Sequence, residues 1–105
     1  MITMKMEQML KQAQKMQAEI ARIQEELSRE VVEGSSGGGM VRVSANGQGE
    51  ILAINIEKDV IDPEEKEMLE DLVIAAIHDA VEKSKELAQS RLGKIGQGLG
   101  IPGFM

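Results

Sequence analysis

One apolar stripe dominates the first quarter of the chain. Its residues are spaced alternately four and three apart, which places side chains along a single seam of a coiled-coil helix. The seam comprises Ile2, Met6, Met9, Ala13, Met16, Ile20, Ile23 and Leu27. Because a stripe this long and narrow cannot be the whole core of a small monomer, it predicts an assembly, most simply a homodimer. The residues expected at the interface between the two chains are Met6, Met9, Ala13, Met16, Ile20, Ile23 and Leu27.

Length and composition restrict the class of protein. A chain of 105 residues forms one domain at most, and it contains no cysteine, so disulfides and thiol chemistry are excluded. The longest apolar run, 73–77, is far shorter than the roughly 20 residues of a membrane-spanning helix, and charged residues interrupt the start of the chain where a signal peptide would be apolar. These features predict a soluble cytoplasmic protein without a membrane partner.

The order of elements predicts an α+β fold of the type α-β-β-β-α. A long N-terminal helix is expected from about residue 3 to about 29, because good helix formers continue there without Gly or Pro. Short runs of β-forming residues at 31–32, 40–45 and 52–56 predict an antiparallel three-stranded meander. A second helix follows, and its broad apolar face between 68 and 81 is expected to cover the sheet. We expect one domain over 1–92 and a flexible Gly-rich tail over 93–105.

Turn and cap signals divide these elements. The Gly- and Ser-rich segment 34–39 is expected to be a flexible connector. Asn46-Gly47 is the strongest hairpin signal and predicts a type I′ turn, with a bulge at Gly49. Asp62 is expected to cap the second helix, with Pro63 at its first position and Glu65 completing a capping box.

No residue pattern predicts catalysis. His78 is the only histidine, and no second ligand or nucleophile stands at a helical spacing from it, so it is interpreted as a surface residue. The 34–39 segment lacks the Lys-Ser or Lys-Thr of a phosphate-binding loop and does not open a helix. We therefore expect no enzyme activity, no metal, no cofactor and no small-molecule substrate.

The charges are unevenly distributed along a chain whose net charge is −6. Residues 57–82 carry ten acidic and two basic groups, whereas residues 83–105 carry four basic groups and one acidic group. Basic residues on both helices are candidates for contacts with DNA phosphates. They are Lys5, Lys11, Lys15, Arg22, Arg29, Lys83, Lys85, Arg91 and Lys94. Taken alone, this pattern is more typical of solvated helix faces than of a DNA-binding surface. A Met-rich seam also suits a non-enzymatic coiled-coil protein-binding scaffold or chaperone-like module.

Several segments, in the same order, resemble the YbaB/EbfC family of bacterial nucleoid-associated proteins. They are Met-Leu-Lys-Gln-Ala-Gln-Lys-Met at 9–16, Val-Glu-Gly at 32–34, Gly-Gly-Gly-Met-Val at 37–41, Asn-Gly at 46–47, Asp-Pro at 62–63 and Glu-Met-Leu-Glu-Asp-Leu-Val at 67–73. The similarity extends over nearly the whole chain. His78 departs from the Asn expected at that position.

The resemblance implies an intertwined homodimer of α-β-β-β-α protomers whose helices project like the arms of tweezers. It implies binding of double-stranded DNA in the nucleoid, with effects on DNA conformation, nucleoid organisation and gene expression. The family pattern supplies no fixed set of contact residues, so the candidate residues depend on charge and position alone. Few of them suit reading of base edges, and low sequence specificity is expected.

Overall fold

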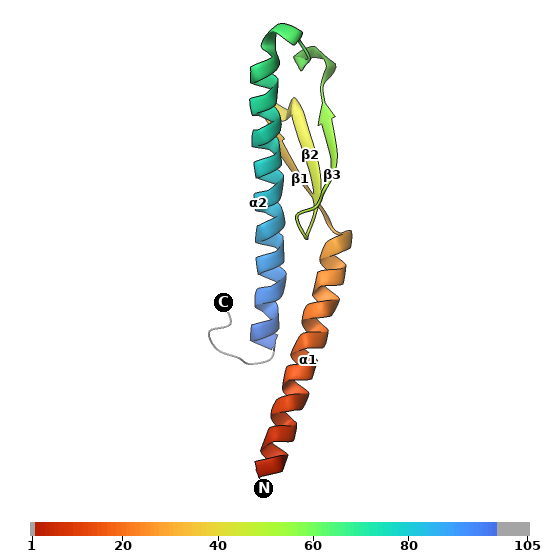
Figure 1. Ribbon diagram of the computed structural model, residues 1–105, viewed down its shortest axis with the longest axis vertical. Coiled ribbons are helices and arrows are strands. Elements are labelled where there is room, and N and C mark those ends of the chain that lie inside the picture. Colours follow the sequence, from red (N-terminus) through yellow and green to blue (C-terminus); the bar gives the residue numbers. More distant parts are fainter. Residues whose placement is uncertain (1, 99–105) are drawn as a thin grey trace.

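A computed structural model of the chain describes residues 2–98, and the predicted α-β-β-β-α order is confirmed (Figure 1). The elements are α1 (Ile2–Arg29), β1 (Val31–Ser36), β2 (Val41–Asn46), β3 (Ile51–Ile56) and α2 (Lys66–Gly98), with single 3₁₀ turns at Gly37–Gly39, Lys58–Val60 and Pro63–Glu65. Residues 99–105 of the expected tail, including Phe104, lie outside the described part.

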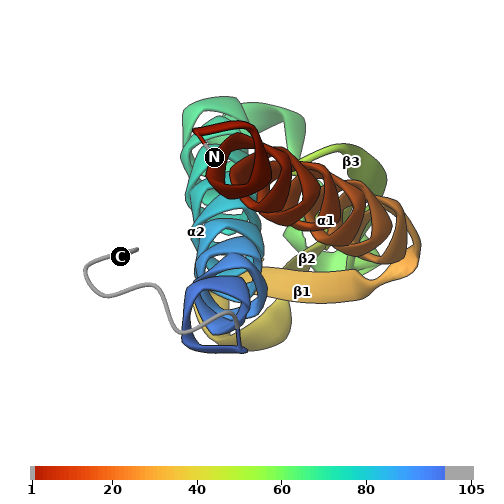
Figure 2. The same ribbon diagram turned by 90° about the horizontal axis from the view of Figure 1, so that it is seen from below.

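Helix α2 forms the spine of an elongated molecule that measures 75 × 22 × 17 Å. The sheet lies against its N-terminal half and α1 lies against its C-terminal half, both on the same side (Figures 1 and 2). The N-terminal part of α1 continues beyond the contact with α2, and the side chains of residues 5–15 are exposed. We call residues 5–15 the arm.

The sheet is the predicted antiparallel meander, with strand order β1-β2-β3. Val41, Val43 and Ala45 alternate along β2 onto the face that meets α2, where all three are fully buried. The small residues Ala76 and Ala80 of α2 are buried against them, which confirms that the apolar face of the second helix covers the sheet. Alanines here let the helix approach the strands closely.

Strand β1 is longer than the sequence predicted, because part of the expected connector is in the sheet. Gly34 pairs with Val43, and a Cβ at Gly34 would lie 2.5 Å from the carbonyl oxygen of Ala76 in α2. Glycine is therefore required for contact with the helix, not for flexibility. The connector is reduced to the 3₁₀ turn Gly37–Gly39, whose φ angles of 59°, 67° and 94° favour glycine.

The hairpin turn is not of type I′, since neither Asn46 nor Gly47 has a positive φ. Instead Asn46 Oδ1 accepts hydrogen bonds from the N–H groups of Gln48 and Glu50 (2.9 and 3.0 Å), and Gly49 takes the positive φ of 84°. The register of β2 and β3 shifts beside this turn, as expected for a bulge.

The same turn closes the C-terminus of α1. The N–H of Gly47 donates to the Leu27 carbonyl oxygen at 2.7 Å, and Asn46 Nδ2 donates to the Ser28 carbonyl oxygen at 3.2 Å. On the other side, Ser84 Oγ of α2 donates to the Asn46 carbonyl oxygen at 2.9 Å. The turn thus joins α1, the sheet and α2, which explains its different geometry.

The C-terminal half of the seam is used within the chain. Leu27 is fully buried and Ile23 is nearly so, in a cluster with Ile95 of α2, while Met16 and Ile20 pack at its edge. This corrects the expectation that Ile23 and Leu27 contact a second chain. Met6, Met9 and Ala13 stay exposed on the arm, and the side chain of Ile2 lies outside the described residues.

Helix α2 begins and ends differently from the prediction in detail. Asp62 caps its start, with Oδ1 accepting from the N–H of Glu64 at 3.0 Å, and Pro63 follows as predicted. The first turn, Pro63–Glu65, is 3₁₀, and the α-helix itself begins at Lys66. It continues through Gly93 to Gly98, past the predicted end at 92, because Ile95 is buried against α1 and offsets the low helix propensity of glycine.

Candidate nucleic-acid interface

Four lysines are available at the end of the molecule where the arm lies. Lys5, Lys11 and Lys15 are exposed on α1, and Lys94 is exposed near the end of α2. Within residues 2–98 none of the four forms an ion pair. Their ammonium groups are therefore free to meet phosphates without first breaking a contact in the protein.

Two further candidates for phosphate contact form only weak ion pairs within the protein. Arg29 pairs with Glu25 at 3.7 Å, and Lys85 pairs with Glu82 at 3.9 Å; every one of these side chains is mostly exposed. Such surface pairs contribute about 0–1 kcal/mol, so a phosphate can replace the carboxylate at little cost.

Lys83 instead holds β1 against α2. Its Nζ lies 3.3 Å from Asp79 Oδ2 and donates to the Glu33 carbonyl oxygen at 3.0 Å. Asp79 Oδ2 also accepts from the N–H of Ser35 at 3.0 Å. The hydrogen bond from Ser35, together with Lys83, lowers the pKa of the Asp79 carboxyl below its ordinary value, so the group is ionised at neutral pH.

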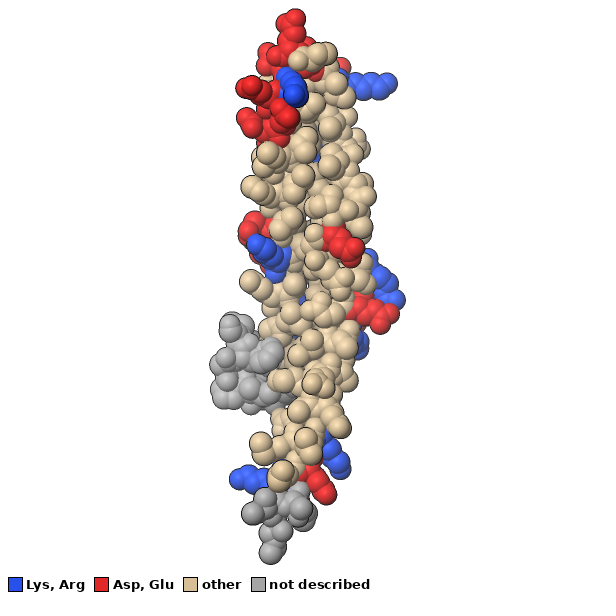
Figure 3. Space-filling view, viewed as in Figure 1, with Lys and Arg blue, Asp and Glu red and all other residues tan. Residues whose placement is uncertain are grey.

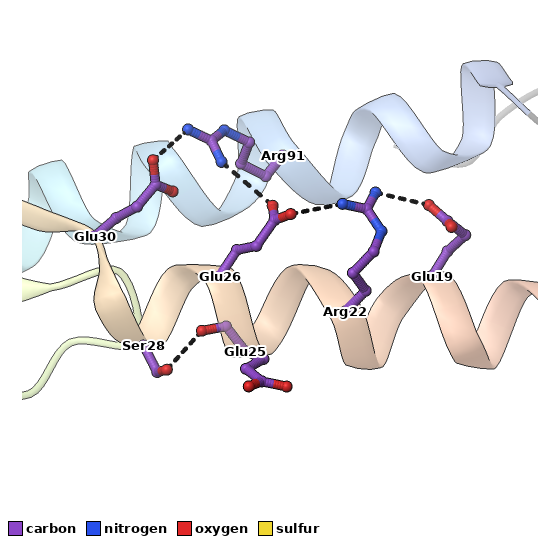
Figure 4. A network of polar contacts seen from close by, with 7 residues as sticks. All are labelled: Glu19, Arg22, Glu25, Glu26, Ser28, Glu30 and Arg91. Carbon is purple, nitrogen blue, oxygen red and sulfur yellow. Dashed lines mark hydrogen bonds and ion pairs between the residues drawn. The ribbon is translucent and has the colours of Figure 1, made fainter.

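Arg22 and Arg91 belong to one ionic network (Figure 4). Arg22 Nη2 donates to Glu19 at 2.9 Å and Nη1 donates to Glu26 at 2.6 Å. The hydrogen bond to Glu19, and then the charges of Glu19 and Glu26, raise the pKa of Arg22, and the hydrogen bond from Arg22 lowers the pKa of Glu19. Arg91 of α2 reaches Glu30 Oε1 at 2.5 Å and Glu26 Oε2 at 3.8 Å. Both arginines were candidates for phosphate contact. The spacings of three and four from Arg22 to Glu19 and Glu26 are a sequence signal for its pairing, whereas nothing local to Arg91 indicates Glu30 as its partner.

Acidic side chains gather at the opposite end of the molecule, over the start of α2 (Figure 3). Asp62, Glu64, Glu65, Glu67, Glu70 and Asp71 are all exposed there. A polyanion is repelled by this end and attracted by the arm end, so the net charge of −6 does not preclude binding at one end only.

The part of the chain that the structure describes gives little support for a metal site or a membrane-spanning helix. Over residues 2–98, no three side chains among His, Asp and Glu come together in a way that could hold a metal ion. His78 is exposed on α2, as interpreted from the sequence. None of the described helices combines the length and apolar character needed to cross a bilayer.

A three-stranded sheet on a helical spine, with a lysine-bearing helical arm at one end, defines a small α+β protein with exposed lysines at one end and carboxylates at the other. Residues 3–99 match the YbaB/EbfC DNA-binding family, and the chain belongs to this family. The resemblance noted from the sequence is thereby confirmed.

Relatives from several bacteria are similar over most of their length. A protein of Syntrophobacter fumaroxidans named nucleoid-associated protein is 48% identical over 95 residues, covering 90% of this chain and 86% of the relative. One of the same name from Bacillus thuringiensis is 52% identical over 87 residues, covering 83% and 80%. The crystal structure of an uncharacterised protein from Helicobacter pylori matches with a TM-score of 0.70 at 26% identity, covering 79% of this chain and 87% of the other.

Proposed function

We propose that two copies of this chain form a homodimer that binds duplex DNA through its phosphates, with low sequence specificity, and thereby affects DNA conformation, nucleoid organisation and gene expression in the cytoplasm. The observation that carries this proposal is the set of unpaired lysines on the arm, Lys5, Lys11 and Lys15, on a chain that is acidic overall and acidic at its other end. The DNA-binding family and the nucleoid-associated relatives support it. The protein acts by binding rather than by catalysis.

The side chains on the arm favour phosphate contact over base reading. Lysine is a point charge that meets a phosphate from many directions, and the glutamines between the arm lysines, Gln8, Gln12 and Gln14, are polar groups that also bond to phosphate and sugar oxygens. Aromatic rings that would stack on unpaired bases are missing from the sequence apart from Phe104. Duplex DNA of any sequence is therefore a better ligand than a single strand.

Pairing of two chains is supported by a surface on the sheet rather than by the helical seam. Strand β3 is an edge strand, and α2 leaves its inner side uncovered: Ile51 is 41% exposed and Ile54 is 46% exposed. Ile74 of α2 is 53% exposed and, at the Ile56 end of the same strand, lines a shallow groove with Ile56, Leu69, Glu70 and Val73. We call Ile51, Ile54 and Ile74 the apolar strip.

A second copy of the chain is the occupant that suits the apolar strip. Strand β3 contains no charged residue and no proline, the usual protections of an exposed edge. Antiparallel pairing of β3 with the same strand of a second copy is self-complementary, satisfies its open backbone groups and covers the strip on both chains. Two arms then belong to one particle and can contact the same duplex.

The salt dependence of DNA affinity tests the proposed function. If about four phosphates are neutralised, the logarithm of the affinity for a short labelled duplex should fall with the logarithm of salt concentration with a slope of roughly −3 to −4. Fluorescence anisotropy titrations at several salt concentrations measure this slope. Two duplexes of unrelated sequence should give similar affinities, as the control for low specificity. An affinity that does not change with salt would contradict phosphate binding.

A further inference from the structure

The arm is a lever whose direction is set at its base. From Lys5 to Glu26 the helix spans about 30 Å, at 1.5 Å per residue. A tilt of about 10° at the base would move the Lys5 end by about 5 Å, more than the roughly 3 Å reach of a hydrogen bond to phosphate. The angle between α1 and α2 therefore decides whether the arm lysines meet a duplex.

Apolar contact alone fixes this angle poorly. The cluster of Ile23, Leu27 and Ile95 holds the helices together, but apolar burial has no direction and permits small rotations. At the arm end, residues 5–15 are exposed and receive no support from α2. The hairpin turn adds hydrogen bonds to the carbonyl oxygens of Gln24, Leu27 and Ser28, which hold the end of α1 to the sheet but do not join it directly to α2. A directional contact between the two helices themselves is still needed to hold the arm at one angle.

Arg91 supplies such a contact. Its guanidinium joins Glu26 in the last turns of α1, at 3.8 Å, and Glu30, the residue directly after the helix, at 2.5 Å (Figure 4). A planar fork held by two carboxylates resists both sliding and tilting of one helix along the other. The Arg91 side chain is only 31% exposed, so solvent screening of the contact is reduced.

Glu30 depends on Arg91 in turn. Its Oε2 atom is buried and, within the described residues, has no hydrogen-bond partner, while Oε1 receives Arg91. Arg22 extends the network by bridging Glu26 and Glu19 along α1. Carboxylates therefore engage both Arg22 and Arg91, so these two arginine side chains are poorly placed to bind phosphate.

We propose that Arg91, through Glu30 and Glu26, is a positioning residue that fixes the angle of the DNA-binding arm, and that it does not itself contact DNA. The proposal rests on the proposed function for its effect on DNA, whereas the effect on the arm angle is independent of DNA.

The test compares Glu30→Gln and Arg91→Gln with the matched controls Glu25→Gln and Lys66→Gln, whose exposed side chains form no ion pair between α1 and α2 within residues 2–98. The chain has no native cysteine. Spin labels can therefore be attached at two exposed positions, through Gln12→Cys on the arm and Gln89→Cys on α2. Pulsed electron paramagnetic resonance on labelled chains diluted into unlabelled protein then gives the distance between the labels at positions 12 and 89 of one chain, which we call the arm distance.

Both Glu30→Gln and Arg91→Gln should broaden the arm distance distribution and weaken duplex binding about three- to tenfold, whereas the controls should leave the distribution unchanged. Glu30→Gln is the decisive variant, because it removes a negative charge and would strengthen DNA binding if charge alone mattered. Unchanged arm distances in both variants would overturn the proposal, as would a Glu30→Gln variant that binds duplex as tightly as the wild type. If the wild type fails to bind duplex, the proposed function fails, and the arm distances alone decide the role of Arg91.

Discussion

Replacing Gly34 with alanine is expected to destabilise the protein strongly, so that the variant unfolds at temperatures at which the wild type is still folded. The added Cβ would lie 2.5 Å from the Ala76 carbonyl oxygen, and it would also collide with the backbone of Ala80. Both obstacles are main-chain atoms of α2, so no side-chain rotation relieves them. Only separation of the helix from the sheet makes room, which exposes the buried cluster of Val41, Val43 and the two alanines.

The expected cost of Gly34→Ala is at least about 3 kcal/mol, the upper part of the range for overpacked cores. That is a large share of the 5–15 kcal/mol by which domains are usually stable. Thermal unfolding followed by circular dichroism should show a fall in Tm of more than about 12 °C. Ser35→Ala on the neighbouring exposed position is the control, and it should change stability by less than about 0.5 kcal/mol. A Gly34→Ala variant that melts like the wild type would show that β1 and α2 are not in this contact.

Reversing the charge of Lys11 and Lys15 together is expected to weaken duplex binding by about a hundredfold at fixed salt. In the dimer four phosphate contacts are lost, two on each chain; at about 0.5–1 kcal/mol each this amounts to about 2–4 kcal/mol, and the new carboxylates add repulsion. Because each lost contact removes roughly one from the salt slope and about four contacts are expected in all, the slope of the variant should approach zero. Both lysines are exposed and unpaired, so the body of the protein is not disturbed.

The matched control for this pair is Lys58→Glu with Lys66→Glu, which makes the same change in net charge at the acidic end of the molecule. These reversals should alter affinity much less than the arm reversals. Because new glutamates at 11 and 15 stand near Glu7 and Glu19, circular dichroism must show that α1 is intact, and Lys11→Gln with Lys15→Gln should give a smaller loss of the same sign. Equal losses at both ends would mean that only net charge matters. No loss at either end would favour the protein-binding scaffold instead.

Local sequence patterns predicted the elements of this fold well, because their signals lie within a few residues of one another. The apolar periodicity of α1, the alternation in β2 and the Asp62-Pro63 start of α2 are all of this kind. The errors arose where distant segments meet. The sequence predicts a loop at Gly34, whereas the glycine lies in a strand and is needed there because it contacts α2, which is distant in the sequence.

The same limit applies to the candidate site. Charge and helical spacing identified the exposed arm lysines, but they did not reveal that Arg91 is paired with Glu30, which is 61 residues away in sequence. Likewise, a heptad seam specifies an apolar stripe without saying which surface covers it. Leu27 belongs to the seam but faces α2 of its own chain. Ile54 and Ile74 of the apolar strip are exposed but belong to no heptad seam, so the sequence did not indicate that surface.

Binding of one duplex by two arms requires two chains, so the oligomeric state is the most direct test of the proposed mechanism. Analytical ultracentrifugation at micromolar concentration should find the wild type at twice the chain mass of 11.5 kDa. Ile54→Lys in the apolar strip should sediment as a monomer, whereas Val31→Lys, at an even more exposed apolar residue on the opposite edge strand, should stay dimeric. A wild-type protein that is compact, folded and monomeric under these conditions would contradict the proposed dimer.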